Sequence, residues 1–237
     1  MAQNLSKFAL LVLVLFFLSG CGRTASSPAE GSGDQAGAPR SGPNSTAGEK
    51  NTGTNDAAGQ PERTDIEVPE PPVVVIETNM GKITVELDPE RTPITVENFL
   101  EYVETGFYDS TLFHQVMEGY AILGGSYSVE WREKPTRVPI RNEADRAPDN
   151  SRGTIAMARL PETIDSATSQ FFINVADNPA LDYKGGTAEE YGYCVFGKVV
   201  EGMEVVDRIA AVPVEDTEEF QRKPIENVVI ERTRRIK

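Results

Sequence analysis

GFYDSTLFHQVMEGYAILGG, residues 106–125, is the stretch of the sequence that decides the fold. β-Branched and aromatic residues cluster from Thr111 to Met117 between turn-forming residues, which predicts a strand. Side chains alternate between the two faces of a strand, so Phe113 and Gln115 are expected on the same face. An aromatic ring beside an amide suits a groove that accepts an apolar residue of a peptide. The plainer interpretation, a core phenylalanine and a solvated glutamine, fits the same pattern and stays open.

The composition narrows the classes of function. The 237 residues favour one or two domains, and 23 Lys and Arg against 37 Asp and Glu give a net charge of −14. No basic stripe stands out, so a nucleic acid is not expected as a partner, and the acidity is interpreted as an aid to solubility. A single cysteine in the body, Cys194, excludes an intramolecular disulfide framework there, and its apolar surroundings indicate a small buried residue.

Residues 1–21 have the features of a targeting segment. Lys7 supplies positive charge, and the apolar run from Phe8 to Leu18 has the length of a signal peptide's hydrophobic region rather than of a membrane span. The run ends in Leu18-Ser19-Gly20-Cys21, which resembles the lipobox of bacterial lipoproteins. This resemblance implies that Cys21 is lipidated and anchors the protein to a membrane of the bacterial cell envelope, outside the cytoplasm. An ordinary secretory signal with a chance cysteine is the alternative.

Residues 22–72 have the composition of a polar linker. They contain almost no large apolar side chain, so they cannot bury enough surface to offset the entropy of ordering, and we expect them to stay disordered. The chain therefore divides into a signal peptide at 1–21, a linker at 22–72 and one folded domain at 73–237.

The body is expected to contain many short strands and two helices. Thr92-Pro93 predicts the start of a helix, with Thr92 as its N-cap, and Gly106 predicts its end. A second, shorter helix is expected at Met203–Ala211. Strands are expected at Val73–Thr78, Lys82–Leu87, Thr111–Met117, Arg152–Arg159, Ser169–Ala176, Tyr193–Val200 and Ile225–Thr233, with a further short run at 120–123. This pattern predicts a β-barrel or a β-sandwich.

Four segments carry a resemblance that covers essentially the whole body. They are GFYDSTLFH, RGTIAMAR, SATSQFFINVADN and GYCVFGKVVEGMEVVD, and they occur in the order and spacing of the cyclophilins. The body resembles a bacterial cyclophilin, which implies a closed eight-stranded antiparallel β-barrel capped by two α-helices. The resemblance also implies a peptide groove on the outside of the barrel and peptidyl-prolyl cis–trans isomerase activity.

The resemblance implies the residues of that groove. Phe113, Phe172 and Leu181 would form the pocket for the proline ring of a substrate, and Gln170 would hydrogen-bond the substrate backbone. Ala158 also matches a groove position, and the remaining matched positions are occupied by two tyrosines, Tyr120 and Tyr193. Tyr120 replaces the family's phenylalanine and keeps an aromatic wall, whereas Tyr193 replaces a histidine that some bacterial members also have as tyrosine.

Four groove positions depart from the family pattern. Gln115 stands in place of the arginine to which the family's chemistry is credited, and this makes Gln115 the candidate catalytic residue. Ala121 replaces methionine, Leu123 replaces glutamine and Ala180 replaces tryptophan or phenylalanine. Changes at four positions of one site indicate a retuned or weakened groove.

The sequence supports more than one function. The first is an isomerase that assists the folding of exported proteins at a reduced rate, binds proline-containing peptide segments, needs no cofactor or metal and works as a monomer. The second is a cyclophilin domain that binds proline peptides with little or no turnover. The third is an inert lipoprotein whose fold is only a scaffold. The only histidine, His114, excludes a catalytic triad and a multi-histidine metal site.

Overall fold

The computed structural model describes residues 70–237. The predicted signal peptide, Cys21 and nearly all of the predicted linker lie outside the described residues. Within the part of the chain that is described, none of the helices has the length and apolar character that a membrane span requires.

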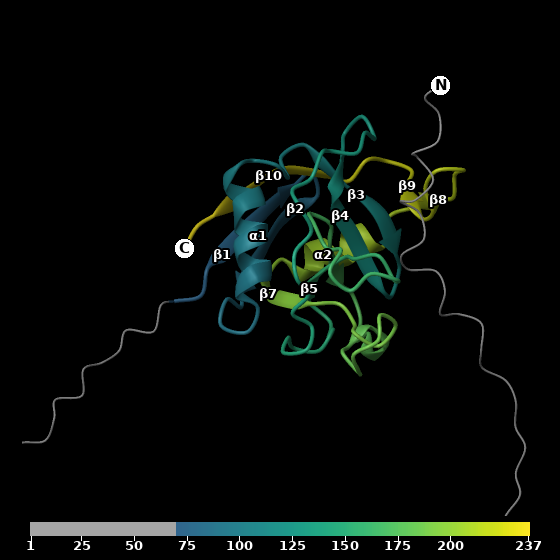
Figure 1. Cartoon of the computed structure of the whole chain (residues 1–237). Coiled ribbons are helices and arrows are strands. Elements are labelled where there is room, and N and C mark those ends of the chain that lie inside the picture. Colours follow the sequence, from purple (N-terminus) through teal and green to yellow (C-terminus); the bar gives the residue numbers. More distant parts are fainter. Residues whose placement is uncertain (1–69) are drawn as a thin grey trace, which may run out of the picture. The chain divides into compact units, whose positions relative to one another are not determined.

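Eight strands form a closed antiparallel barrel in the order β1-β10-β3-β4-β6-β5-β7-β2. This confirms the expected fold class. Figure 1 shows how the labelled strands and the two helices are arranged in space. The bounds of the barrel strands are β1 Val73–Thr78, β2 Gly81–Leu87, β3 Thr111–Met117, β4 Ala121–Ser128, β5 Thr154–Met157, β6 Phe171–Asn174, β7 Val195–Glu201 and β10 Val229–Arg235. The two ends of the described chain meet, because the Ile236 N–H donates to the Val73 carbonyl over 2.8 Å.

Several strand predictions had wrong bounds: the strand expected at 193–200 is β7, and the short run expected at 120–123 is the longer β4. The strands expected at 152–159 and 169–176 are β5 and β6, which are both only four residues long. The closing strand expected at 225–233 begins later, as β10. Two further strands, β8 (Val214–Glu215) and β9 (Lys223–Pro224), were not predicted; they pair as a two-stranded sheet outside the barrel.

Helices α1 (Pro93–Glu104) and α2 (Met203–Ala210) pack their apolar faces against the interior of the barrel, and a single 3-10 turn, η1, spans Pro179–Leu181. Thr92 occupies the N-cap of α1 as expected, but its hydroxyl donates to the Asp88 carbonyl over 2.9 Å and caps nothing. The free amides of the first turn instead reach the buried carboxylate of Glu143, which accepts from Thr95 N–H over 2.9 Å. A residue far along the chain therefore supplies the cap.

The strands carry two separate apolar clusters, one on each face of the sheet. The inner cluster fills the barrel and contacts both helices. The second cluster, called the outer cluster below, consists of seven buried residues: Ala121, Leu123, Ala156, Ala158, Phe172, Leu181 and Val195. Alternation explains the division, because Phe171 and Ile173 belong to the inner cluster and Phe172, between them, to the outer cluster.

Candidate functional site

The prediction that Phe113 shares a pocket with Phe172 and Leu181 is wrong. Phe113 is completely buried in the inner cluster, where its ring meets Phe171 edge to face at 6.1 Å between centroids. Phe172 and Leu181 belong to the outer cluster on the opposite face. The plainer interpretation of Phe113, as a core residue, is therefore the correct one.

A β-bulge explains why the alternation rule failed in β3. Phe113 is paired with Gly124 and Gln115 with Leu123, so the register shifts between them. The additional residue turns the Gln115 side chain to the outer face, although Gln115 is two positions from an inward-facing residue. Gly124 leaves room for the Phe113 ring opposite the bulge, because a Cβ atom there would lie 3.0 Å from that ring, closer than an ordinary van der Waals contact.

The outer cluster brings most of the other predicted groove residues together. Ala121, Leu123, Ala158, Phe172 and Leu181 are members, and Tyr120 and Tyr193 pack against it while half-buried. The Phe172 and Tyr193 rings meet edge to face with 5.8 Å between their centroids. Ala180, beside Leu181, is exposed. The outer cluster as a whole draws on β4, β5, β6, β7 and the segment that contains η1, so only the folded barrel assembles it.

The two glutamines flank this cluster differently. Gln115 lies opposite Leu123 across the β3–β4 pair and is half-buried, and within residues 70–237 its amide has no hydrogen-bond partner. The side-chain amide of Gln170 already has a hydrogen-bond partner, because its Nε2 donates to Ser126 Oγ over 3.2 Å. Gln115 is therefore the glutamine whose amide is free to meet a ligand.

Burial keeps both tyrosines at the edge of the cluster in their neutral form. It raises the pKa of Tyr120 to about 12, with a smaller contribution from the nearby Tyr193. Burial also raises the pKa of Tyr193, which the Arg159 guanidinium opposes. At neutral pH both phenols are hydrogen-bond donors, and neither can act as a charged group.

Arg159 is a residue of this region that the sequence did not single out. It is buried, and its guanidinium donates to backbone carbonyls of two loops, with distances of 2.9 Å from Nη1 to Leu160 and 2.8 Å from Nε to Gly192. The guanidinium carbon also lies 5.0 Å from the centre of the Tyr193 ring. Arg159 thus fixes the chain around Tyr193. The sequence does contain a sign that Arg159 is unusual, because this charged residue directly follows the apolar run 155–158.

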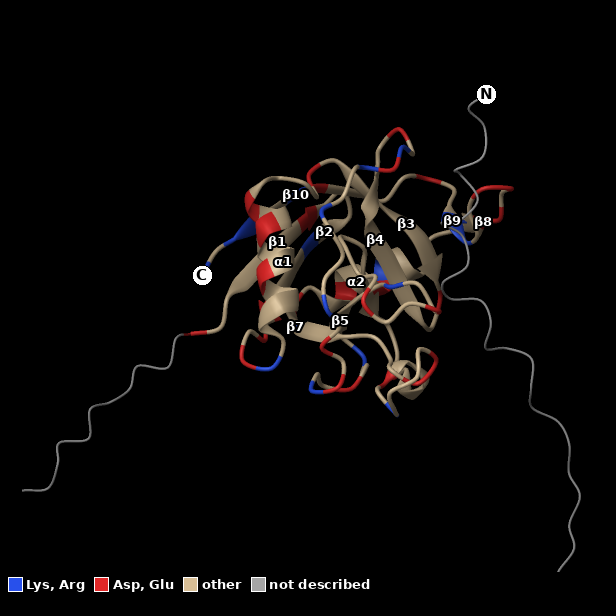
Figure 2. Ribbon diagram, in the orientation of Figure 1, with Lys and Arg blue, Asp and Glu red and all other residues tan. Residues whose placement is uncertain are grey.

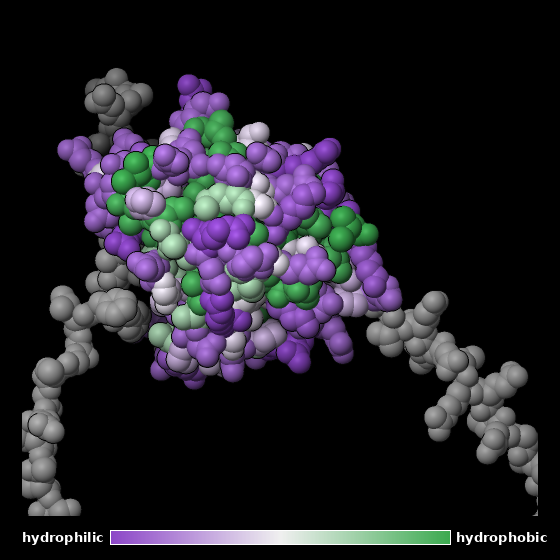
Figure 3. Space-filling model, turned by 180° about the vertical axis from the view of Figure 1, so that it is seen from behind, coloured by the Kyte–Doolittle hydropathy of each residue, from purple (hydrophilic) through white to green (hydrophobic). Residues whose placement is uncertain are grey.

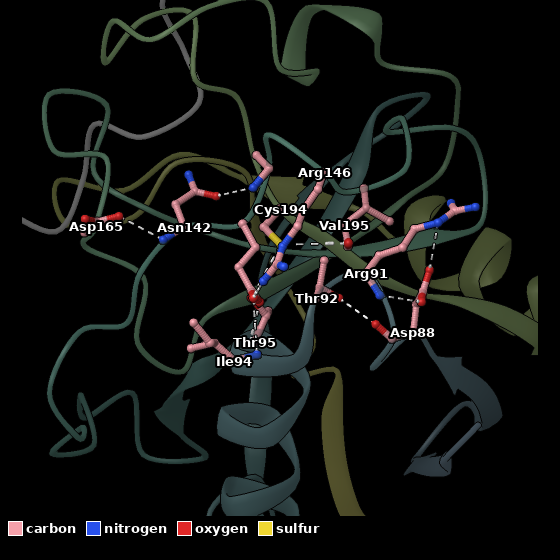
Figure 4. Close-up of polar contacts among 12 residues, drawn as sticks. Asp88, Arg91, Thr92, Ile94, Thr95, Asn142, Arg146, Asp165, Cys194 and Val195 are labelled. Carbon is pink, nitrogen blue, oxygen red and sulfur yellow. Dashed lines mark hydrogen bonds and ion pairs between the residues drawn. The ribbon is translucent and has the colours of Figure 1, made fainter. Parts of the chain in front are cut away.

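The chain behind Tyr193 is anchored to helix α1. Cys194 is buried as expected, and its sulfur lies 3.4 Å from Thr95 Oγ1. Figure 4 shows Cys194 close to Arg146, directly over the first turn of α1 that carries Thr95. Burial raises the pKa of the Cys194 thiol to about 12, so it is not a reactive thiolate at neutral pH.

A cavity of about 430 Å³ exists elsewhere, between the end of α1 and strand β10. Its lining includes Gly106, Asp109 and Thr233, and none of its lining residues is a predicted groove residue. Exposed large apolar side chains are scattered, and Figure 3 shows them interspersed with hydrophilic residues on the face that it presents. The described residues contain no group of three or more His, Cys, Asp or Glu side chains placed to hold a metal ion.

The chain is similar to known proteins over the whole barrel. A family model described as cyclophilin type peptidyl-prolyl cis-trans isomerase/CLD matches residues 73–235. Peptidyl-prolyl cis-trans isomerase A of Dickeya dadantii is 47% identical over 164 residues, which are 69% of this chain and 84% of the relative. Peptidyl-prolyl cis-trans isomerase B of Escherichia coli is 45% identical over 159 residues, which are 67% of this chain and 96% of the relative.

Solved structures agree with these relatives. The crystal structure of a cyclophilin type peptidyl-prolyl cis-trans isomerase of Cryptosporidium parvum has a TM-score of 0.58 and 26% identity, and the match covers 70% of this chain and 98% of that one. A second crystal structure of it, in the presence of the dipeptide Ala-Pro, gives a TM-score of 0.56 at 26% identity over 68% and 96% of the two chains. By its sequence and by the barrel described above, the chain belongs to the cyclophilin-type peptidyl-prolyl cis–trans isomerases.

Proposed function

We propose that this domain isomerises X–Pro bonds of exported proteins at the outer cluster, at a rate reduced by the presence of Gln115. The relatives are named as isomerases, and a related structure was determined in the presence of Ala-Pro. The observation that carries the proposal is the place of Gln115. Within residues 70–237 its side-chain amide has no hydrogen-bond partner, and it lies opposite Leu123, at the edge of the outer cluster that also contains Phe172 and Leu181.

The reaction needs a shaped surface and one donor. An X–Pro bond has a rotation barrier of about 18–20 kcal/mol and exchanges over tens to hundreds of seconds without a catalyst. No covalent bond breaks, so the catalyst has only to bind the twisted amide better than either planar form. Apolar residues hold the proline ring, and a hydrogen-bond donor reaches the proline nitrogen as its lone pair is released from resonance.

In this proposal the ring pocket consists of Phe172, Leu181 and the wall formed by Tyr120. Gln115 donates from Nε2, but the donor is neutral, whereas an arginine would make a charge-assisted bond of roughly twice the strength. Removing a preorganised donor costs about 10²–10³ in rate. A neutral donor should lose part of that range, so slow turnover with little change in peptide affinity is expected.

Gln115→Arg tests the assignment. We expect it to raise kcat/KM for a proline peptide by about tenfold or more, as part of the range for a preorganised donor. Gln115→Met, which keeps the length without a donor, should lower the rate, and Asn79→Arg, far from the outer cluster, controls for added positive charge. Equal rates for the Gln115 variants and the wild type would refute the role of Gln115.

A binding module is the second candidate, and the neutral side chain at position 115 is the observation that favours it. In that case the full-length protein would bind a proline peptide without measurable turnover, and Gln115→Arg would create activity. A protein that neither binds nor isomerises such a peptide would fit only an inert scaffold. One protease-coupled rate assay and one peptide titration separate these results.

The cellular place of the reaction is part of the proposal. The lipobox ending in Cys21 supports a lipid anchor on the extracytoplasmic side of a bacterial membrane, where exported chains fold. Each buried methylene of an acyl chain contributes roughly 0.8 kcal/mol to membrane binding. Cys21→Ser should therefore move the protein from the membrane fraction to the soluble fraction. If the variant stays in the membrane fraction, Cys21 is not the anchor.

A further inference from the structure

A chain of three buried asparagine amides lies beside the outer cluster, where Asn174 pairs with Ala121 across β4 and β6. Asn178 Nδ2 donates to Asn174 Oδ1 over 2.7 Å, and Asn174 Nδ2 donates to Asn150 Oδ1 over 3.2 Å. Asn174 Nδ2 also donates to Thr154 Oγ1 over 2.8 Å. Asn150, Asn174 and Asn178 are at most 5% exposed. They come from the loop before β5, the end of β6 and the residue before η1.

The two ends of this chain bind backbone carbonyls of residues at the outer cluster. Asn178 Nδ2 donates to the Tyr120 carbonyl over 3.1 Å. At the other end, Asn150 Nδ2 donates to the Leu181 carbonyl over 3.1 Å and lies 3.3 Å from the Tyr193 carbonyl. Three residues that are far apart in the sequence are thus connected through one set of side chains.

Other bonds strengthen each connection. The Tyr193 N–H donates to the Leu181 carbonyl over 2.9 Å, so these two residues are linked to each other as well as to Asn150. The Asn178 N–H donates to the Asn150 carbonyl over 2.8 Å, and the Asn150 N–H donates to Asp182 Oδ1 over 2.7 Å. The turn at Tyr120 and the segments of Leu181 and Tyr193 therefore cannot move independently.

We infer that Asn150, Asn174 and Asn178 are positioning residues, which set the distance between Tyr120 on one side of the peptide site and Leu181 and Tyr193 on the other. An amide is suited to this task because it both donates and accepts, so three in series relay one fixed geometry. In a buried network each unpaired member is costly, so the chain of amides favours one arrangement over all others. This inference rests on the proposed function, because Tyr120, Leu181 and Tyr193 matter only if they contact the peptide.

The first test is Asn178→Ala, which releases the Tyr120 side from the network. We expect a proline peptide to bind about tenfold more weakly, and kcat/KM to fall by the same factor, with kcat nearly unchanged. This is below the ~10²-fold loss that a misplacement of 1 Å can cause. Asn79→Ala is the matched control, because its amide also joins distant segments, through Asn227 and Val229, but far from this site.

The second readout does not depend on activity. In Asn150→Ala the backbone amide hydrogen of Tyr193 should exchange at least tenfold faster with solvent. It donates to the Leu181 carbonyl, and this carbonyl is no longer held by the Asn150 side chain in the variant. In Asn79→Ala the exchange of Tyr193 should be unchanged. If the asparagine variants do not fold, Thr154→Val provides a milder test. It removes the acceptor that serves Asn174, together with an exposed hydrogen bond to the Ser151 carbonyl, and should change affinity and exchange in the same direction.

The outcomes separate the two proposals. Unchanged peptide affinity and unchanged Tyr193 exchange, with only a loss of stability like that of Asn79→Ala, would overturn the positioning role. Weaker binding together with faster exchange would support it. If the wild-type protein binds no proline peptide, the proposed function fails, and the exchange of Tyr193 in Asn150→Ala alone then decides whether the network fixes this segment.

Discussion

The two halves of the barrel differ in what their outer faces carry. The charged residues of the barrel strands all lie on β1, β2, β7 and β10, and cross-strand neighbours among them pair: Lys82 Nζ lies 2.9 Å from Glu77 Oε1, and Lys198 Nζ lies 3.0 Å from Glu86 Oε1. In contrast, β3, β4, β5 and β6 contain no charged residue, and Figure 2 shows β3 and β4 tan along their length. Their outer face instead carries most of the outer cluster.

This difference indicates which half binds a ligand. Charged side chains on an outer face are solvated by water and form ion pairs with each other, so no other segment has to pack over them. An apolar outer face has to be covered, here by the segments around Ala147, Leu181 and Tyr193. Because Tyr120, Tyr193 and Gln115 remain only half-buried at its edge, this cover is incomplete, and a proline ring could extend it.

The largest expected effect tests the division between the inner and outer clusters. Phe113→Ala should lower the free energy of unfolding by about 3–5 kcal/mol, the usual cost of deleting a buried ring, and leave the peptide affinity of the folded protein unchanged. Leu181→Ala should lower stability less and weaken peptide binding clearly. Denaturant unfolding and a peptide titration of both variants provide the check. A selective loss of affinity in Phe113→Ala would place Phe113 at the peptide after all.

A smaller effect concerns His114, which lies in the uncharged half and is buried. Burial lowers its pKa from 6.5 to about 4, so between these values the unfolded chain binds a proton that the folded protein does not. Stability is therefore complete above pH 6.5 and falls as the pH drops towards 4, by about 2 kcal/mol at pH 5. Denaturant unfolding from pH 7.5 to pH 5 measures this loss.

His114→Gln should flatten that dependence, because the variant lacks the titrating group. The quantity to compare is the slope of the unfolding free energy against pH in the two proteins, since the other titrating groups contribute equally to both. Equal slopes for His114→Gln and the wild type would show that His114 is accessible to protons in the folded protein.

The smallest expected effect lies on the charged half. Glu86→Gln breaks an ion pair in which the side chains are 34% and 62% exposed, and exposed pairs contribute only about 0.2–1 kcal/mol. The change in unfolding free energy should stay below about 1 kcal/mol and shrink further in salt, with no effect on peptide binding. A stability loss of several kcal/mol, measured by denaturant unfolding, would contradict the contrast between the halves.

The strands and helices of the barrel could be predicted because their patterns are local. Val73–Thr78 and Thr111–Met117 were predicted with the bounds that they have, since β-branched residues and turn formers mark both ends. The bulge between Phe113 and Gln115 could not be predicted in this way, because it depends on how β3 pairs with β4. Because β3 has one additional residue at this bulge, Phe113 faces the core although Gln115 faces outward.

The site was predicted in part, for a similar reason. Matching positions to the family identified Phe172, Leu181 and Tyr193, which the fold does bring together. The asparagine network was missed, because asparagines are common in loops, and the bonds that join Asn150 and Asn178 to Tyr120, Leu181 and Tyr193 link residues more than thirty positions apart in the chain. Arg159 was missed for the same reason.

The central claim, that the uncharged half of the barrel binds proline peptides, is tested most directly by NMR mapping of an Ala-Pro peptide on the protein. We expect saturable shifts of the backbone amides of Gln115, Leu123, Phe172 and Tyr193, while the amides of β1, β2 and β10 stay unchanged. Shifts confined to the lining of the 430 Å³ cavity beside β10, or no saturable shifts at all, would contradict it.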